Sequence, residues 1–276
     1  MTTPDILQRI VAQRRKRLAS EAAPSLPSPT EIGSARSPRE NPFLVQIATK
    51  KQQRLPAIIA EIKMGSPRLG SIADRFDPIA QARLYAEGGA TCLSVVVEPD
   101  FFYGSWELLT ACKEASGLPA VAKDFVVDES QLLNAKAAGA DVILLVAALL
   151  EADELAHYAT LARSLGLVPL VETHDTDDLA KLALAEASDE WQSEDFAEWE
   201  LVGVNNRNLR TFEVELERSL TMAPLLPFQA IKVAESGIAS GADVMLLAEG
   251  GFDAFLIGES LLLAKDPRAL LSELVG

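Results

Sequence analysis

The sequence predicts an α/β protein of the (β/α)8 TIM-barrel type with an N-terminal helical extension. From Leu55 onward, short apolar runs alternate with segments of helical pattern, and the unit repeats about every 30 residues. The unit occurs eight times, and the chain length of 276 residues suits one barrel. Both observations favour a closed barrel of parallel strands surrounded by helices.

The first 50 residues differ in pattern from the rest of the chain. Apolar residues recur there at roughly helical spacing between basic ones, which predicts an amphipathic helix over 5–20. A Pro- and Ser-rich stretch follows, and then a short helical candidate over 43–47. We therefore expect an extension, 1–50, that packs on a catalytic barrel, 51–276.

The expected strands are apolar runs bounded by turn and helix signals. They cover residues 56–63, 92–98, 120–126, 141–147, 168–173, 201–206, 231–235 and 254–258. Asp77 before Pro78, Asp128, and Asp266 before Pro267 are suited to cap the helices that follow. An open, doubly wound sheet is the alternative, but it would usually carry a Gly-rich phosphate loop after the first strand, and none follows here.

The composition restricts the partners of the protein. With a formal net charge of −15, the chain should repel nucleic acid and anionic membrane surfaces, so neither is expected to bind. No run reaches the roughly 18 apolar residues of a membrane span, and the N-terminus lacks a secretory signal. The two cysteines, Cys92 and Cys112, have no metal-ligand spacing, so we expect no metal and a reduced, cytoplasmic location. An anionic substrate would need a local cluster of Lys and Arg.

Such a cluster is predicted where the strands end. Side chains two apart share one face of a strand, and several strands place a charged or amide group near their C-terminal end. Barrel enzymes hold their active sites at this end. The residues are Glu61, Lys63, Lys123, Glu172, Asn205, Arg207 and Glu235. They could instead pair only with one another as a polar plug, but three carboxylates, two lysines and an arginine exceed what packing requires.

The residue types in this cluster suit acid–base chemistry on a phosphorylated substrate. Carboxylates beside ammonium groups in a partly desolvated cavity acquire pKa values that are pushed apart. Ser236-Gly237 and Gly258 follow the last two strands, where barrels often bind a phosphate, and Arg207 is expected nearby. His174, one step beyond its strand, is interpreted as a solvated or structural residue.

Six segments, in order, resemble indole-3-glycerol-phosphate synthases. They are IIAEIKMGSP (58–67), AKDFVVDESQ (122–131), LVETH (170–174), GVNNRNL (203–209), VAESGI (233–238) and FLIGESL (255–261). The similarity extends from about Leu55 to the C-terminus, and the extension matches the helices that precede the barrel in that family.

The resemblance implies a carbon–carbon lyase of tryptophan biosynthesis. Its substrate would be 1-(2-carboxyphenylamino)-1-deoxyribulose 5-phosphate, converted to indole-3-glycerol phosphate with loss of carbon dioxide and water. The family uses no metal or organic cofactor. Contact with other enzymes of the tryptophan pathway is left open by the sequence.

The resemblance also implies residue roles. Lys123 would be the general acid that protonates the ketone oxygen, and Glu172 the base that orients the intermediate, with Asn205 nearby. Glu61 and Lys63 would assist dehydration and steer the substrate carboxylate, and Glu235 would line the pocket opposite them. The residues implied to bind substrate or its phosphate are Ser66, Phe102, Phe125, Leu144, Arg207, Ser236, Gly237 and Gly258.

The chain departs from the family pattern in three places. The loop 64–69 lacks the Lys or Arg that usually precedes Ser-Pro, and we hypothesise that Arg68 restores this charge from the other side. Val97 replaces a common Thr, and Tyr103 stands where a small or amide residue is frequent. These changes bear on substrate affinity and loop motion, and they leave the acid–base set complete.

An acidic segment, 188–200, interrupts the alternation of helices and strands. It is longer than the usual connection between a helix and a strand. We interpret it as a solvated loop with Trp191 and Trp199 packed beneath it, and a partner-binding role is the alternative.

Two other functions are weighed against the synthase. A phosphoribosylanthranilate isomerase would require a Cys base and an Asp acid at strand ends, and Cys92 lies at the wrong end of its strand. A non-catalytic paralogue that only binds a phosphorylated metabolite would have no need of poised bases such as Glu61 and Glu172.

Overall fold

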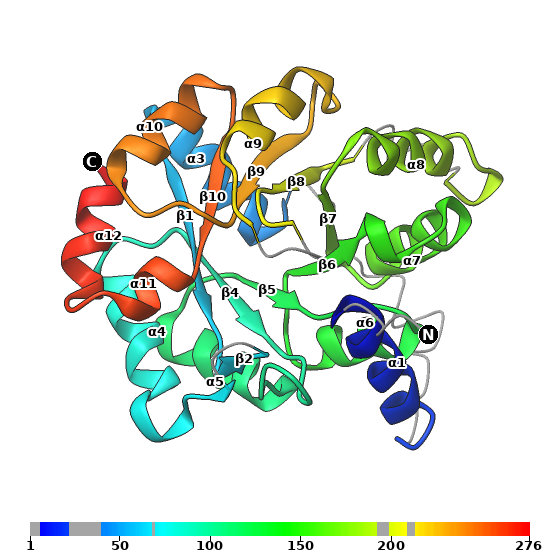
Figure 1. Cartoon of the computed structure of the whole chain (residues 1–276), viewed down its shortest axis with the longest axis horizontal. Coiled ribbons are helices and arrows are strands. Elements are labelled where there is room, and N and C mark those ends of the chain that lie inside the picture. Colours follow the sequence, from blue (N-terminus) through cyan, green and yellow to red (C-terminus); the bar gives the residue numbers. More distant parts are fainter. Residues whose placement is uncertain (1–5, 22–39, 68–69, 192–198, 209–212) are drawn as a thin grey trace.

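The strands close into a barrel, as the sequence predicts (Figure 1). A computed structural model describes residues 6–21, 40–67, 70–191, 199–208 and 213–276. Within these ranges, eight parallel strands pair in the order β1-β10-β9-β8-β7-β6-β5-β4, and β4 pairs with β1 again. They are β1 (Ala57–Ile62), β4 (Cys92–Val96), β5 (Ala120–Lys123), β6 (Val142–Val146), β7 (Val168–Thr173), β8 (Leu201–Asn205), β9 (Ile231–Glu235) and β10 (Ala254–Ile257). All the expected strands are confirmed.

Helices lie around the barrel and at both of its ends. They are α1 (Ile6–Leu18), α3 (Pro42–Gln53), α4 (Pro78–Glu87), α5 (Trp106–Ser116), α6 (Glu129–Ala137), α7 (Ala152–Ser164), α8 (Thr176–Glu186), α9 (Glu217–Met222), α10 (Gly241–Glu249), α11 (Glu259–Leu263) and α12 (Pro267–Val275). Short connections form a hairpin of β2 (Gly65–Ser66) and β3 (Gly70–Ser71) and the 3₁₀ turns η2 (Ala73–Arg75), η3 (Ala147–Leu149), η4 (Asp189–Trp191) and η5 (Ala223–Leu225). The caps predicted at Asp77, Asp128 and Asp266 are confirmed, since each carboxylate accepts backbone N–H groups of the following helix. In the part of the chain that the structure describes, no helix combines the length and the apolar character that crossing a bilayer would require.

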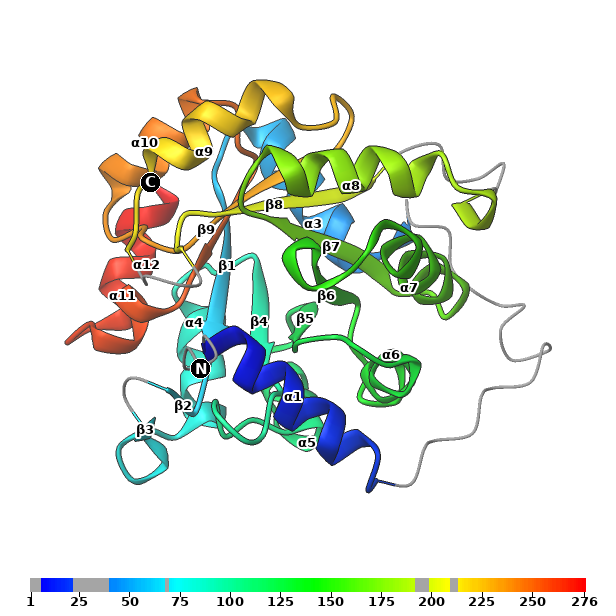
Figure 2. The same ribbon diagram turned by 45° about the vertical axis from the view of Figure 1, so that its right-hand side comes forward.

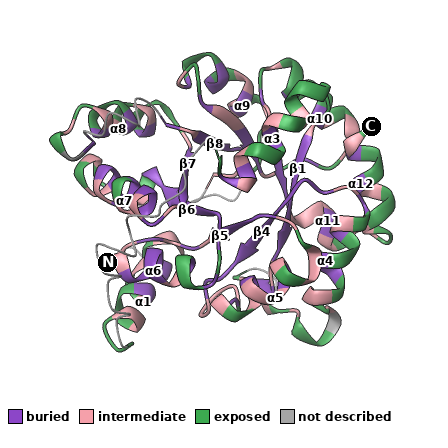
Figure 3. Ribbon diagram, turned by 180° about the vertical axis from the view of Figure 1, so that it is seen from behind, coloured by how far each residue is buried: buried purple, intermediate pink, exposed green. Residues whose placement is uncertain are grey.

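The strands separate two apolar cores, and Figure 3 shows the strands as mostly buried. Ile59 packs with inward residues of the other strands, while Ile58 and Ala60 pack outward against the helices. At the N-terminal end of the barrel, Phe43 and Ile47 of α3 are fully buried in the inner core. The helix predicted over 43–47 is therefore longer than expected and closes this end.

At the opposite end, α1 lies across the barrel beside the ends of β4 and β5 (Figure 2). The Arg14 guanidinium forms an ion pair with Asp124, with Nη2 and Oδ2 2.6 Å apart, and the two side chains are 2% and 0% exposed. Arg17 pairs at 2.6 Å with Asp100, in the loop after β4. Because Asp124 turns toward Arg14 and also binds Gln131, β5 ends at Lys123 rather than continuing as far as expected.

The two tryptophans of the acidic segment form an aromatic cluster. The rings of Trp191 and Trp199 have centroids 4.4 Å apart, and both residues are buried, as predicted. The Arg163 guanidinium lies 4.1 Å from the Trp191 ring centroid and pairs with Glu200 at 2.8 Å. Residues 192–198, which carry much of the acidic charge, lie outside the described residues. The two tryptophans thus fix the ends of this segment to the barrel.

Candidate active site

A cavity of about 660 Å³ opens at the C-terminal end of the barrel. Of the predicted site residues, it is lined by Glu61, Lys63, Ser66, Phe102, Lys123, Phe125, Leu144, Glu172, Asn205, Arg207, Ser236, Gly237 and Gly258. The cavity is also lined by Ile6, Leu7 and Ile10 of α1, three residues that were not predicted from the sequence. Their apolar spacing predicted a helix, but nothing local indicated what the helix would cover.

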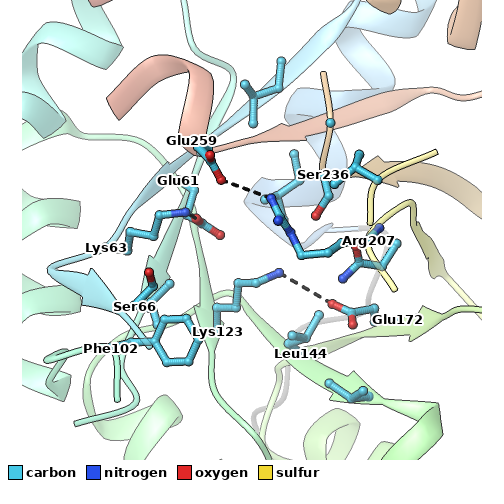
Figure 4. A pocket seen from close by; sticks show the side chains of 18 of the residues that line it. Glu61, Lys63, Ser66, Phe102, Lys123, Leu144, Glu172, Arg207, Ser236 and Glu259 are labelled. Atoms are coloured by element: carbon cyan, nitrogen blue, oxygen red, sulfur yellow. Dashed lines mark hydrogen bonds and ion pairs between the residues drawn. The ribbon is translucent and has the colours of Figure 1, made fainter. Parts of the chain in front are cut away.

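Lys123 occupies the centre of the site (Figure 4). It is the last residue of β5, and its Nζ lies 2.9 Å from Oε2 of Glu235 and 3.6 Å from Oε2 of Glu172. Burial disfavours the ammonium form, but these carboxylates, together with Glu61, raise the pKa of Lys123 above its ordinary value. The side chain therefore carries a proton when substrate arrives.

Glu235 is the one predicted site residue outside the cavity wall. The side chain, 1% exposed, extends from the end of β9 beneath Lys123, so the expectation that it lines the pocket is wrong. Burial raises the pKa of Glu235 to about 7, although Lys123 acts in the opposite direction. For Glu172, burial also favours the neutral form, but Lys123 and His174 lower the pKa to about 2. The two glutamates that face Lys123 thus differ in basicity, as acid–base chemistry requires.

Gly203, in β8, leaves the space that the Glu235 carboxylate occupies. A Cβ atom at this position would clash with Oε1 of Glu235. We expect Gly203→Ala to destabilise the protein by about 1–3 kcal/mol, because overpacking displaces a buried, ion-paired side chain. Urea denaturation would measure the loss. In the double variant with Glu235→Ala the clash is absent, so strictly additive losses would contradict this assignment.

Glu61 and Lys63 form a second ion pair at the end of β1, with Oε1 and Nζ 2.9 Å apart. Burial raises the pKa of the Glu61 carboxyl, but Lys63 and Lys123 outweigh it, and the pKa lies below its usual value. A Cβ atom at Gly258 would clash with the Glu61 carboxylate, so only glycine lets the chain after β10 approach this pair. The pair adjoins the loops expected to hold phosphate.

Arg207 lies on that side of the cavity, following β8. Its Nη2 is 3.1 Å from Oε2 of Glu259, and its backbone N–H donates to Oδ1 of Asn205. The guanidinium is 26% exposed, which leaves it accessible to an anion. Ser236 and Gly237 both have positive φ, at 69° and 81°, and direct the chain after β9 along the cavity wall. The contact of Glu259 with Arg207 was not foreseen, although Glu259 follows Gly258 directly.

Phe102 and Phe125 form the apolar wall, with ring centroids 5.9 Å apart. Phe102 is held by Glu98, a buried residue just beyond β4 that the sequence analysis missed. The Glu98 carboxylate accepts N–H groups of Asp100, Phe101 and Phe102 at 3.0, 2.7 and 2.9 Å. The signal in the sequence that could have indicated Glu98 is an acidic residue at the end of an apolar run.

His174 is not solvated. Its side chain is 11% exposed, and Nε2 lies 3.2 Å from Oε1 of Glu172. Since the two residues share one face of the strand in sequence, this contact was predictable.

The departures in the loops fall near the cavity. Tyr103 has a φ of 59° and is 46% exposed, and its ring lies so close to Gly65 that a Cβ there would clash. Val97 is buried in the outer core. Arg68, proposed to restore a missing charge, lies outside the described residues.

Comparison with known proteins identifies the family. A family model described as indole-3-glycerol phosphate synthase matches residues 7–274. The chain belongs to the indole-3-glycerol phosphate synthase family. Proteins named indole-3-glycerol phosphate synthase from Neisseria meningitidis serogroup B and Azoarcus sp. are 39% and 40% identical to it, over 270 and 274 residues. These alignments cover 98% and 99% of this chain and 99% of each relative. The Burkholderia vietnamiensis protein of that name is 38% identical over 271 residues, 98% of either chain.

Indole-3-glycerol phosphate synthases are carboxy-lyases of tryptophan biosynthesis, and this is the activity of the chain. The isomerase alternative is therefore excluded. In agreement, Cys92 is fully buried in the inner core at the start of β4, away from the cavity.

Proposed function

We propose that the cavity above Lys123 is where 1-(2-carboxyphenylamino)-1-deoxyribulose 5-phosphate closes its indole ring, with Lys123 as general acid. The observation that carries this proposal is the placement of one partly buried ammonium group between two carboxylates of opposite pKa shift. Ring closure joins the aromatic carbon that bears the carboxylate to the ketone carbon. The ketone oxygen then needs a proton, and Nζ of Lys123 is the donor at the centre of the site.

Glu172 supports the same step from the opposite side. When the aromatic ring attacks the ketone, the lone pair of the amine nitrogen moves toward the new bond, and the nitrogen becomes positively charged. An ionised carboxylate stabilises this charge, and the lowered pKa keeps Glu172 ionised. Carbon dioxide then leaves with its bonding electrons remaining in the ring. Glu61 and Lys63 are assigned to the later loss of the former ketone oxygen as water, and Asn205 orients the intermediate beside Glu172.

The phosphate of the substrate is assigned to Arg207 and to the loops of Ser236, Gly237 and Gly258. The Glu259 carboxylate forms an ion pair with the Arg207 guanidinium in this structure. A phosphate that binds Arg207 would displace this carboxylate. Glu259 is 35% exposed and can turn to solvent. The aromatic ring is assigned to the wall of Phe102, Phe125 and Leu144, and Ser66 also lines the cavity. We assign residues 1–50 to an extension whose first helix completes this wall.

Arg207→Ala is expected to raise KM by about 10–100-fold and to change kcat by less than about fivefold. A hydrogen bond to a charged group contributes about 1.5–3 kcal/mol, and the phosphate takes no part in the chemical step. Steady-state kinetics would measure both constants. The control is Arg268→Ala, whose guanidinium is 60% exposed in a surface pair with Glu87. A loss confined to kcat would contradict the phosphate assignment.

The reaction itself is tested by a continuous assay of the purified protein. With 1-(2-carboxyphenylamino)-1-deoxyribulose 5-phosphate as substrate and no added metal or cofactor, indole fluorescence should rise. Tight binding without turnover would favour a non-catalytic paralogue and would contradict the proposed chemistry.

A further inference from the structure

His174 contacts Glu172 without lining the cavity. It directly follows β7, and its Nε2 lies 3.2 Å from Oε1 of Glu172. The other ring nitrogen, Nδ1, lies 3.5 Å from Oδ2 of Asp178. The imidazole therefore lies between two carboxylates, and its side chain is only 11% exposed.

Asp178 fixes the position of His174. Its carboxylate, 6% exposed, belongs to the first turn of α8 and accepts the backbone N–H of His174 at 2.9 Å. The backbone N–H of Asp178 in turn donates to Asp175, which caps the helix. One carboxylate thus accepts the backbone N–H of His174 and lies within ion-pair distance of its ring, and the helix start holds that carboxylate.

The local charge balance favours a cation at His174. Glu172, Asp178 and Glu235 are all buried, and Lys123 faces two of them. Buried carboxylates are costly unless they are paired. Burial disfavours a charged imidazole, but Asp178 and Glu172 raise the pKa of His174 to about 9. This raised pKa favours the imidazolium form of the ring at neutral pH.

Glu172 divides its two oxygens between two cations. Oε1 faces His174, and Oε2 faces Lys123. We propose that His174, held by Asp178, is a positioning residue that fixes the Glu172 carboxylate and keeps it ionised for ring closure. This inference rests on the proposed role of Glu172 in the reaction. His174 does not touch substrate, because it lies outside the cavity wall.

The first test does not depend on catalysis. The chain has two histidines, so NMR titration of the unliganded protein, with His157→Asn for assignment, reports His174 directly. We expect its midpoint above about pH 8, and we expect Asp178→Asn to lower it by about one unit or more. A midpoint near the ordinary value of about 6.5 would overturn the proposal.

The second test is the pH dependence of kcat in His174→Gln, which keeps an amide donor but removes the charge. The charged groups that face His174 are Glu172 of β7, Asp178 of α8, and, across Glu172, Lys123 of β5 and Glu235 of β9. We expect kcat to fall about tenfold and KM to change less than about twofold. Because Glu172 loses a cation and its pKa rises, the acid limb should move up by about one pH unit.

Asp266→Ala is the control, because it removes the carboxylate that caps a different helix, α12, and takes no part in the ion pairs of His174. It should lower stability without moving the acid limb. The proposal fails if the acid limb of His174→Gln coincides with that of the wild type, or if Asp266→Ala moves the limb equally. Wild-type turnover is measured first. Its absence would count against the proposed function and leave the NMR test standing.

Discussion

Lys123→Ala is expected to lower kcat by about 10²–10⁴-fold, the usual contribution of a general acid. The variant lacks the proton donor for the ketone oxygen, and no other ammonium or guanidinium group lies as close to Glu172 and Glu235 among the described residues. Substrate binding should weaken by less than about tenfold, because the phosphate and the aromatic ring are held elsewhere. Steady-state kinetics and a binding titration would measure the two effects.

The variant should remain folded. Removing the ammonium leaves Glu235 beside Glu172, but Glu235 already has its pKa raised to about 7 by burial and can take up a proton. A neutral carboxyl is tolerated where an unpaired carboxylate is not. Circular dichroism would check the fold. Lys51→Ala is the control, since that side chain is 62% exposed and lies in a surface pair with Asp253.

The variant Lys123→Arg tests whether Lys123 acts by donating a proton or only by its positive charge. The guanidinium keeps the positive charge near Glu235, but it does not lose its proton under these conditions. We expect activity close to that of Lys123→Ala. An Arg variant with more than about a tenth of wild-type kcat would contradict a general-acid role and would leave a purely electrostatic one.

The fold could be predicted from the sequence because its signals are local. The strands are mostly apolar and mostly buried, and several helices begin at an Asp that caps them. The site could be predicted for a related reason. Pleating and the closure of the barrel bring the last inward residue of each strand to one rim, so Glu61, Lys123 and Glu172 had to meet there.

What could not be predicted depends on contacts between distant segments. Arg14 and Asp124 are 110 residues apart, and no local pattern indicates that they meet. The position of Glu235 beneath Lys123 depends on the space at Gly203, in the neighbouring strand. These contacts depend on how the side chains pack together at the rim of the barrel. No periodic pattern in the sequence indicates them.

The ion pair of Arg14 and Asp124 links the extension to the site, because Asp124 follows the proposed acid and α1 contributes Ile6 and Ile10 to the cavity wall. Arg14→Met removes a guanidinium that is 2% exposed and leaves the Asp124 carboxylate buried without its cation. Breaking a buried pair in this way costs about 3–5 kcal/mol. We expect that loss in urea denaturation, together with a KM raised about tenfold as α1 leaves the cavity.

The double variant Arg14→Met with Asp124→Asn decides between lost charge pairing and lost packing. Replacing both members of a buried ion pair by neutral residues of similar volume is often close to neutral for stability. If the unpaired carboxylate causes the loss, the double variant should regain at least half of the lost stability, and at least half of the increase in KM should disappear. The introduced amide would keep an oxygen that accepts a hydrogen bond from the side chain of Gln131. A double variant as unstable as Arg14→Met would show instead that the shape of the arginine side chain, rather than its charge, holds α1 over the active site.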